Sequence, residues 1–143
     1  MSRLSLESAA HIVDAALAHA GVLKLKPLTV AVLDAGGHLV AFKRQDGSGI
    51  LRPQIAQGKA WGAVGMGVGG RALAERAQQA PAFFVGLASA SGGRVIPVPG
   101  GVLIKGSDGE VVGAVGISGD HPEHDEACAI FGIEQAGLTA QPG

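Results

Sequence analysis

Apolar residues recur every three or four positions near the start of the chain. They are Ile12, Val13, Ala16, Leu17 and Ala20. This spacing places side chains on one face of an α-helix. Ser5 has the hydroxyl that an N-cap needs, and Gly21 suits the position just after a helix. The pattern therefore predicts an amphipathic helix over residues 5–20.

The remaining apolar runs are short and are separated by turns rich in glycine and proline. Strands are predicted at 28–34, 38–44, 94–98, 101–105 and 110–118. Helices are predicted at about 53–66, at 71–79 and from Asp120 to about 137. We interpret residues 81–93 as a short helical turn and a loop. This order predicts an antiparallel sheet with helices packed on its faces, in a single domain over residues 1–143.

Composition and charge narrow the class of protein. Hydrophobic residues make up 47% of the chain, which is enough for a sizeable core. The net charge of −1 and the 3% of aromatic residues argue against nucleic-acid binding. No apolar run is long enough for a membrane span. The N-terminal apolar pattern is interrupted by Glu7, His11 and Asp14, whereas the apolar region of a signal peptide is continuous. We expect a cytoplasmic protein without nucleic-acid or membrane partners.

The glycine-rich run GMGVGG (65–70) matches the spacing of a dinucleotide-binding loop letter for letter. That loop requires a preceding strand, whereas the pattern here predicts a preceding helix. We therefore interpret the run as a helix terminus.

Three further segments carry groups that suit a binding site. The FKRQDG segment (42–47) ends a predicted strand in basic residues, with Arg44 and Asp46 close together. Charged groups at a strand end can line a site, and a solvated turn is the alternative. Lys59 lies on a helix of small residues, where it could reach a ligand carboxylate or extend to solvent. The VPGGV turn (98–102) could form a pocket floor, or only a corner between strands.

The stretch HPEHDEAC contains four side chains of types that bind metals. They are His121, His124, Asp125 and Cys128, at positions i, i+3, i+4 and i+7. On a helix they would lie along one stripe, and His121, His124 and Asp125 could hold a zinc or iron ion. The alternative is an ordinary helix N-terminus, capped by Asp120 with Glu123, in which Cys128 belongs to the core.

Taken in order, four segments resemble one known family. They are VAVLDAGGHLVAFKRQDG, IAQGKAWGAV, VPGGVLIKGSDGEVVGAVGISGD and HDEACA. The ordered set is similar to the GlcG/HbpS-like family, also called the haem-degrading or DUF336 domain, over about residues 5–138. The same domain forms the C-terminal part of PduO-type proteins. The resemblance implies an α+β fold, namely a profilin-like three-layer α/β/α sandwich around a five-stranded antiparallel sheet. It also implies homo-oligomers, often octamers, and haem or iron binding in some members.

The resemblance also assigns candidate site positions. They are Arg44 with Asp46 and Gly47, Lys59, Gly100 and Gly101, Ser118 with Gly119, and Asp125 with Glu126. The histidines at 121 and 124 are not part of the family pattern and are specific to this chain.

Two functions follow as hypotheses. The first is a small-ligand-binding protein for haem or a related tetrapyrrole, in which Arg44 or Lys59 pairs with the propionates. The cofactor-binding candidates are Arg44, Lys59, Gly100, Gly101, Ser118 and His121. Because the chain has no tyrosine, the axial ligand would be one of His121, His124, His38, Cys128 and Met66. The second is an enzyme or accessory protein of a catabolic pathway that acts on a small carboxylate metabolite, whose carboxylate Arg44 or Lys59 would hold. Asp46 or Asp125 would be its acid/base, provided that burial shifts the pKa.

Overall fold

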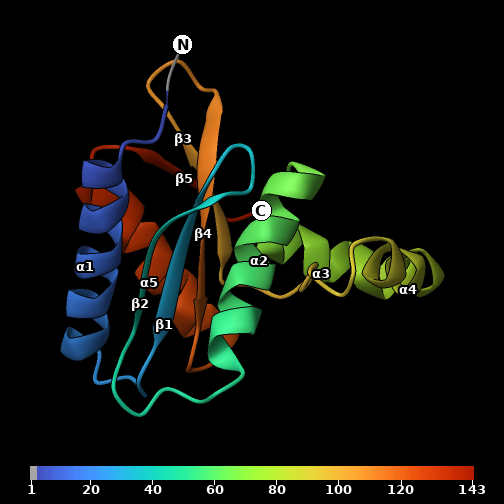
Figure 1. The fold of residues 1–143 in the computed structure, drawn as a ribbon, viewed down its shortest axis with the longest axis horizontal. Coiled ribbons are helices and arrows are strands. Elements are labelled where there is room, and N and C mark those ends of the chain that lie inside the picture. Colours follow the sequence, from blue (N-terminus) through green and yellow to red (C-terminus); the bar gives the residue numbers. More distant parts are fainter. Residues whose placement is uncertain (1–2) are drawn as a thin grey trace.

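The computed structural model describes residues 3–143, which contain five helices and five strands (Figure 1). The helices are α1 (Leu6–Val22), α2 (Arg52–Met66), α3 (Gly70–Gln79), α4 (Pro81–Ala90) and α5 (Pro122–Gln135). The strands are β1 (Thr29–Asp34), β2 (Leu39–Arg44), β3 (Gly101–Lys105), β4 (Val111–Ser118) and β5 (Thr139–Gln141). None of the helices in this described part is long and apolar enough to cross a membrane.

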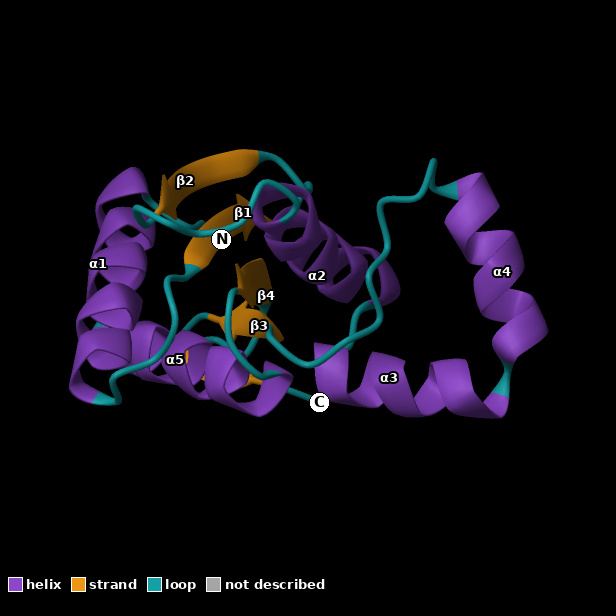
Figure 2. Ribbon diagram, turned by 90° about the horizontal axis from the view of Figure 1, so that it is seen from below, coloured by secondary structure: helices purple, strands orange, loops and turns teal. Residues whose placement is uncertain are grey.

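The five strands form one antiparallel sheet in the order β2-β1-β4-β3-β5. Helices α1 and α5 pack together on one face of the sheet, and α2 covers the other face (Figure 2). The molecule is thus a three-layer α/β/α sandwich, which confirms the predicted α+β fold class and its five-stranded antiparallel sheet.

Apolar side chains alternate between the two faces of the sheet, as the period of a strand requires. Val30 and Val32 of β1 belong to the core beneath α1 and α5, together with Ile12 and Ile133. Leu33 of the same strand belongs to the smaller core beneath α2. The sheet is therefore buried on both sides, which explains why β1 and β4 read as nearly continuous apolar runs.

The predicted elements differ from the structure at the fifth strand. Residues 94–98 form no strand, because Pro97 and Pro99 lack the N–H groups of a sheet ladder, and Ile96 N–H donates to the Gly58 carbonyl of α2 instead. The fifth strand is β5 at the C-terminal end, which pairs with β3. Its three residues are too few to show an alternating pattern in the sequence.

Three predicted boundaries also change. Residues 81–90 form the full helix α4 instead of a turn and a loop. The Ser5 hydroxyl caps α1 by accepting from Ser8 N–H, as predicted, but the helix continues through Gly21 to Val22. The N-cap of α5 is His121 and not Asp120, so the predicted capping pair of Asp120 and Glu123 is wrong by one residue. The helix-terminus interpretation of GMGVGG is confirmed, because Gly67 ends α2 in the left-handed conformation at φ 73°.

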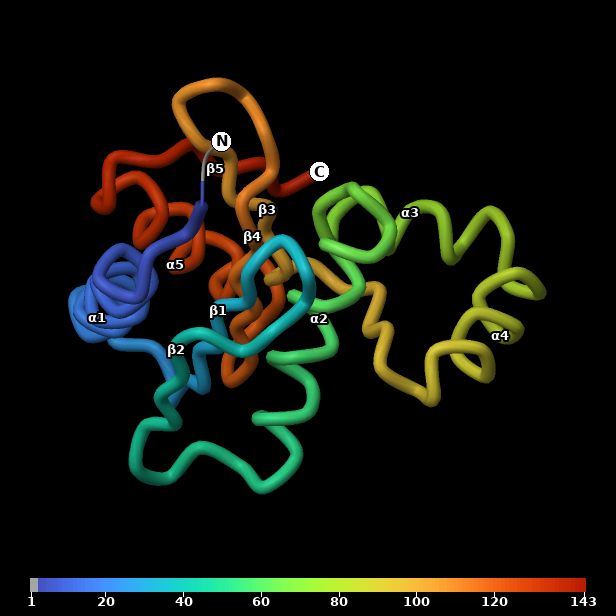
Figure 3. Tube along the Cα trace, turned by 45° about the horizontal axis from the view of Figure 1, so that its top comes forward, coloured from blue at the N-terminus to red at the C-terminus, as the bar shows by residue number. Residues whose placement is uncertain are grey.

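Helices α3 and α4 form an arm that extends away from the sandwich (Figure 3). No residue of α4 is buried, although its sequence PAFFVGLASA contains no charged side chain. In contrast, α2 is held very close to the sheet by glycine. A Cβ atom at Gly116 of β4 would clash with the backbone carbonyl oxygen of Ala56 and the N–H of Ala60. The absence of a side chain at position 116 thus sets the distance between α2 and β4.

We expect Gly116→Ala to lower the free energy of unfolding by at least about 3 kcal/mol, because the clash involves backbone atoms that cannot rotate away. Chemical denaturation monitored by circular dichroism measures this loss. Gly65→Ala in α2 is the matched control, since a Cβ there meets nothing within 4 Å. The control should be neutral or stabilising by up to about 1 kcal/mol. Equal stability of the two variants would contradict this account of the α2–β4 contact.

Candidate functional site

The register of the sheet brings two of the predicted site segments to the same end. Thr29 of β1 pairs with Arg44 on one side and with Ser118 on the other. The loop that follows Arg44 and the loop that follows Ser118 therefore leave the sheet side by side, at the lower end in Figure 1. This end, with the segments 44–52 and 118–125, is called the β2/β4 end below.

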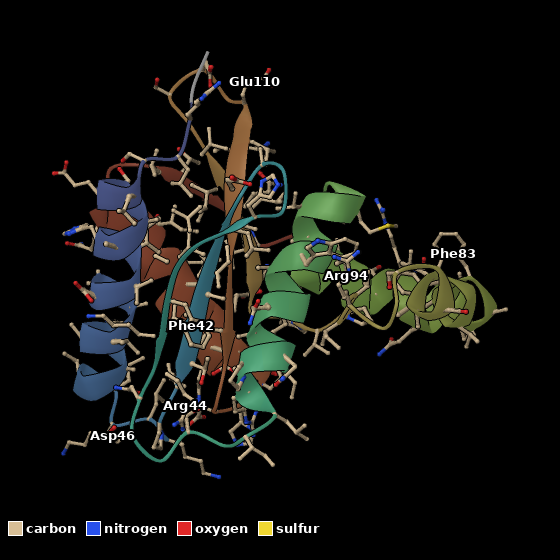
Figure 4. All side chains as sticks on the ribbon, in the orientation of Figure 1. Phe42, Arg44, Asp46, Phe83, Arg94 and Glu110 are labelled. Atoms are coloured by element: carbon tan, nitrogen blue, oxygen red, sulfur yellow. The ribbon has the colours of Figure 1, made fainter. Side chains whose placement is uncertain are left out.

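Hydrogen bonds hold the loop after β2 in one conformation. Gln45 exchanges two bonds with Leu28, since its N–H donates to the Leu28 carbonyl and its side-chain Oε1 accepts from Leu28 N–H at 2.7 Å. The Arg44 guanidinium donates to the Ser48 carbonyl at 2.8 Å. The hydroxyls of Ser48 and Thr29 are 2.7 Å apart in the interior. The loop is thus a fixed part of the site and presents Arg44 and Asp46 to solvent (Figure 4).

A shallow pocket of about 560 Å³ lies beside this loop. One wall is apolar, formed by Leu17 of α1 with Leu25 and Pro27. The rim is charged, formed by residues 43–46. Lys43 also donates to Asp14 across the surface at 2.8 Å, and both side chains of that pair are 60% exposed. Such an exposed pair is weak, so the Lys43 ammonium remains available to a ligand anion. We call this feature the rim pocket.

Beneath the β2/β4 end lies a buried ion pair that joins the two helical layers. Lys59 of α2 and Asp125 of α5 come from opposite faces of the sheet and are 3% and 0% exposed. The Lys59 Nζ donates to the Ile117 carbonyl at 2.8 Å and lies 3.4 Å from Asp125 Oδ2. The other oxygen, Oδ1, accepts from Asp120 N–H at 3.0 Å. Both charged groups therefore have their partners inside the protein.

The glycines of the VPGGV turn make room for this pair. A Cβ atom at Gly100, where φ is 115°, would lie 2.9 Å from Lys59 Nζ. A Cβ atom at Gly101 would clash with the Lys59 carbonyl group. The sequence left two interpretations of this turn, the floor of a ligand pocket or only a corner between strands. In the structure, the space that these two glycines leave open is filled by Lys59.

Burial dominates the ionisation of both groups. Loss of solvent raises the pKa of Asp125, and the nearby Lys59 charge and the backbone N–H groups of Asp120 and Gly119 only partly oppose this. Burial likewise lowers the pKa of Lys59, against the attraction of Asp125. Each side chain therefore depends on the other to remain charged. The shifted pKa of Asp125 meets one condition for an acid/base, but its side chain has no access to solvent.

Asp120 connects the start of α5 to the rim pocket. Its Oδ1 accepts from His121 N–H and from His124 Nδ1, each at 2.7 Å. Its Oδ2 accepts at 2.9 Å from the N–H of Lys26, which lies between two residues of the pocket wall, Leu25 and Pro27. These bonds, the one from His124 foremost, lower the pKa of Asp120. Because an ionised carboxylate only accepts, the His124 proton lies on Nδ1 and the Nε2 lone pair is free in the neutral ring.

The structure does not assemble the predicted metal trio. Asp125 faces the interior toward Lys59, whereas His124 faces Asp120. The His121 ring packs edge to face against His124, with the ring centroids 5.7 Å apart. Within residues 3–143, no group of three or more His, Cys, Asp or Glu side chains is arranged to hold a metal ion. Cys128 lies in the core, and burial raises the pKa of its thiol to about 11, as expected of a structural cysteine.

Two functional neighbours were not predicted from the sequence. Arg52 donates to the Ser118 hydroxyl at 2.9 Å and adds a cation to the β2/β4 end. Asp120 was recognised only as a cap, although its carboxylate joins the start of α5 to Lys26 in the segment before β1. Arg52 could have been predicted as a site residue, because it directly precedes Pro53 and so lies at the start of the helix that follows the charged loop. Nothing in the sequence indicated the contact of Asp120 with Lys26, which is 94 residues away.

Removal of one partner of the buried pair leaves the other as an uncompensated charge. We therefore expect Lys59→Met to lower the free energy of unfolding by about 3–5 kcal/mol, and Lys59→Met with Asp125→Leu to lose much less than the sum of the single variants. Urea unfolding of the four proteins in this cycle measures both quantities. Lys43→Met, which breaks only the exposed pair with Asp14, is the control and should lose under about 1 kcal/mol. Strict additivity in the cycle would show that Lys59 and Asp125 do not interact.

Comparison with known proteins agrees with this architecture. The family model described as "Haem degrading protein HbpS-like" matches residues 4–134. The chain is 31% identical over 122 residues to the corrinoid adenosyltransferase PduO of Salmonella typhimurium, and 30% identical to that of Citrobacter freundii. The match covers 85% of this chain but only 35% and 36% of those two relatives, so the chain spans about a third of their length.

Solved structures show the same fold. The crystal structure of a PduOC:haem complex superimposes with a TM-score of 0.86 at 29% identity, over 96% of this chain and 97% of that one. A double mutant of HbpS from Streptomyces reticuli gives 0.81 at 27% identity, over 94% and 88% of the two chains. The Klebsiella pneumoniae protein ORFY gives 0.85 at 24% identity, over 96% and 93%, which supports the fold alone. With a match over nearly its whole length, as the sequence motifs predicted, the chain belongs to the HbpS-like family of haem-degrading proteins.

Proposed function

We propose that this protein binds a small ligand, and that haem or a related tetrapyrrole is the ligand its structure suits best. The description of the family names haem, and the PduOC domain of the same fold has been crystallised with haem. The observation on this chain that carries the proposal is the composition of the rim pocket. It combines an apolar wall with a rim in which two cations, Lys43 and Arg44, stand beside the single carboxylate of Asp46, and such a lining suits an amphiphilic anion.

The residues of the β2/β4 end fit the parts of haem. Leu17, Leu25 and Pro27 would contact the apolar face of the porphyrin, and Lys43 and Arg44 would pair with the propionates. Lys59, the other predicted propionate anchor, is already engaged by Asp125 and the Ile117 carbonyl. When bound, haem would supply a redox-active iron at this surface.

His124 is the best candidate for the axial ligand. Its Nδ1 donates to the Asp120 carboxylate, the arrangement by which proteins orient metal-binding histidines and raise their basicity. Asp120 also holds Lys26 at the pocket wall, so the histidine and the pocket share one anchoring residue. The side chain of His124 is 51% exposed and hence accessible to a ligand. Two of the other predicted candidates suit the role less well, since Cys128 is buried and His38 lies at the opposite end of β1 from the rim pocket.

Titration with haem, followed at the Soret band, tests the proposal. We expect saturable binding to the natural protein, and a shifted band with at least about tenfold weaker binding in His124→Ala. Replacing both Lys43 and Arg44 by Gln should weaken binding and leave the position of the band unchanged, because the propionates do not alter the iron ligand.

His11→Ala is the matched control, since His11 is exposed on α1, forms a hydrogen bond with the Gln135 carbonyl and does not line the rim pocket. Its titration should match that of the natural protein. An absence of saturable binding would refute the proposed function. Saturable binding with an identical spectrum in His124→Ala would support haem as the ligand but refute His124 as the axial ligand.

The enzymatic alternative rests on different groups. Arg44 and Asp46 both line the rim pocket, so an anion anchor and a candidate acid/base are adjacent there. Asp125 would need a large opening of the interior before it could reach a substrate. The structure thus favours Asp46 over Asp125 for any acid/base role at this end, and the haem titration leaves this hypothesis open.

We propose further that the protein forms a homo-oligomer through the α3–α4 arm. Phe83 and Val85 of α4 are 57% and 72% exposed, and a ten-residue apolar helix packed on one neighbour is marginal in water. A second copy of the chain suits the arm, because the loop before α2 exposes Ile50 and Leu51 at 90% and 66%. An oligomer would cover both apolar surfaces at once.

Sedimentation velocity measures the assembly. We expect Phe83→Glu with Val85→Glu to reduce the assembly to smaller species, because two charges cannot be buried in an apolar contact without partners. Ser107→Glu with Gln135→Glu, which adds the same charge at two exposed polar positions outside the arm, should leave the assembly unchanged. A monomeric natural protein would refute the proposal.

A further inference from the structure

A second hollow, separate from the rim pocket, lies on the α2 side of the sheet. Its volume is about 350 Å³, and it shares no lining residue with the rim pocket. It is bounded by the turn between β1 and β2, by the outer side of α2 and by the loop 92–94. We call it the Trp61 hollow, after the single tryptophan of the chain, which forms part of its wall.

A stacked pair of side chains forms its polar end. The Arg94 guanidinium lies over the Trp61 ring, 3.9 Å from the ring centroid. Its Nε donates to the Ser91 carbonyl at 3.1 Å, so the side chain is held from both sides. Arg94 forms no ion pair with any acidic residue among those described, which leaves the terminal N–H groups of the guanidinium for a ligand. A guanidinium on an aromatic face is already partly desolvated, and it therefore binds an anion at a smaller desolvation cost.

The turn between β1 and β2 is shaped to approach the indole. Gly37 has a φ of 82°, and a Cβ atom there would lie 3.0 Å from Trp61 Nε1. The same turn carries the carboxylate of Asp34, which could repel an anion. Its Oδ1 accepts from Gly36 N–H and His38 N–H, and the His38 ring pairs with it as well. The charge of Asp34 is thus occupied within its own turn.

The remaining walls combine apolar and amide groups. Leu33 and Leu39 supply apolar surface from β1 and β2. Gln54 and Gln57 stand one turn apart on α2, and both line the hollow. The amide of each can donate to a carboxylate and accept from a polar substituent. One cation with a largely apolar and aromatic lining suits a monoanion with a hydrophobic body, and it does not suit a polyanion such as a phosphate ester.

We propose that the Trp61 hollow is a second ligand site, which binds a small planar organic monocarboxylate. The ring of the ligand packs against Leu33, Leu39 and Trp61, and its carboxylate accepts hydrogen bonds from Arg94. Gln54 and Gln57 select among ring substituents. The site is independent of haem, because no residue of the rim pocket or of the Asp120–His124 pair contributes to it.

Benzoate is a suitable probe, and the intrinsic fluorescence of Trp61 is a direct readout, because no other tryptophan contributes to it. With excitation at a wavelength that benzoate does not absorb, we expect a saturable change in emission. Benzamide has the same shape without the charge, and it should bind at least about tenfold more weakly. In a ¹H–¹⁵N spectrum the single indole N–H resonance should shift along the same saturation curve.

Arg94→Gln should weaken benzoate binding at least about tenfold and bring it close to that of benzamide. Arg76→Gln on α3 is the matched control, since it removes one exposed arginine outside the hollow and should leave binding unchanged. Thermal melting of both variants confirms that they are folded, as expected for exposed side chains. Emission that does not respond to benzoate, or that responds equally in Arg94→Gln, would overturn the proposal. Emission that changes only with protein concentration would also overturn it, because the hollow would then be a contact between copies of the chain.

Discussion

The buried ion pair between Lys59 and Asp125 is the contact on which the β2/β4 end of the molecule depends. It joins α2 and α5, which lie on opposite faces of the sheet, at the point where β4 ends. Two charged groups without access to water must remain within reach of each other, and this requirement positions both helices. The Gly100–Gly101 turn has no side chains because Lys59 passes there. Asp125 in turn receives the N–H of Asp120, whose carboxylate orients His124 and the wall of the rim pocket.

This arrangement separates the structural charges from those that can meet a ligand. The ammonium of Lys59 is neutralised in the interior, whereas Lys43 and Arg44 stand at the surface, paired only weakly or with backbone groups. In the proposed function, these two surface cations are the groups that would attract an anionic ligand to the rim pocket. On the α2 side, Arg94 is the proposed anion-binding cation, and it lies against the aromatic ring of Trp61 instead of an aliphatic wall. The two proposed ligand sites thus share no lining residue, and the Trp61 hollow lies on the α2 side of the sheet.

Much of the fold could be predicted from the sequence, and the failures have definite causes. Strong periodicity located α1, α2, β1, β2, β3 and β4 to within about two residues, because long apolar stripes reflect one buried face. Residues 94–98 looked like a strand from their apolar composition, but two prolines remove the ladder donors. Helix α4 was missed because it buries no face in its own chain and so shows no amphipathic pattern. The motif residues lie at one end of the sheet, as their shared presence in a site requires. Motif spacing alone could not show that Lys59 is buried and Arg44 is exposed.

By itself, the sequence determined the α+β class, four of the five strands of the antiparallel sheet, the family, and the list of side chains with chemistry to offer. These depend on local periodicity and on residue types, which are properties of neighbours along the chain. The tertiary structure alone decided the role of each side chain. It buried Lys59 and Asp125 together, separated Asp125 from the two histidines, and placed Asp120 between His124 and Lys26. It also placed Arg94 on Trp61, 33 positions earlier in the chain. Burial and long-range contact set the charge state and accessibility of a group, and neither is encoded in the spacing of a motif.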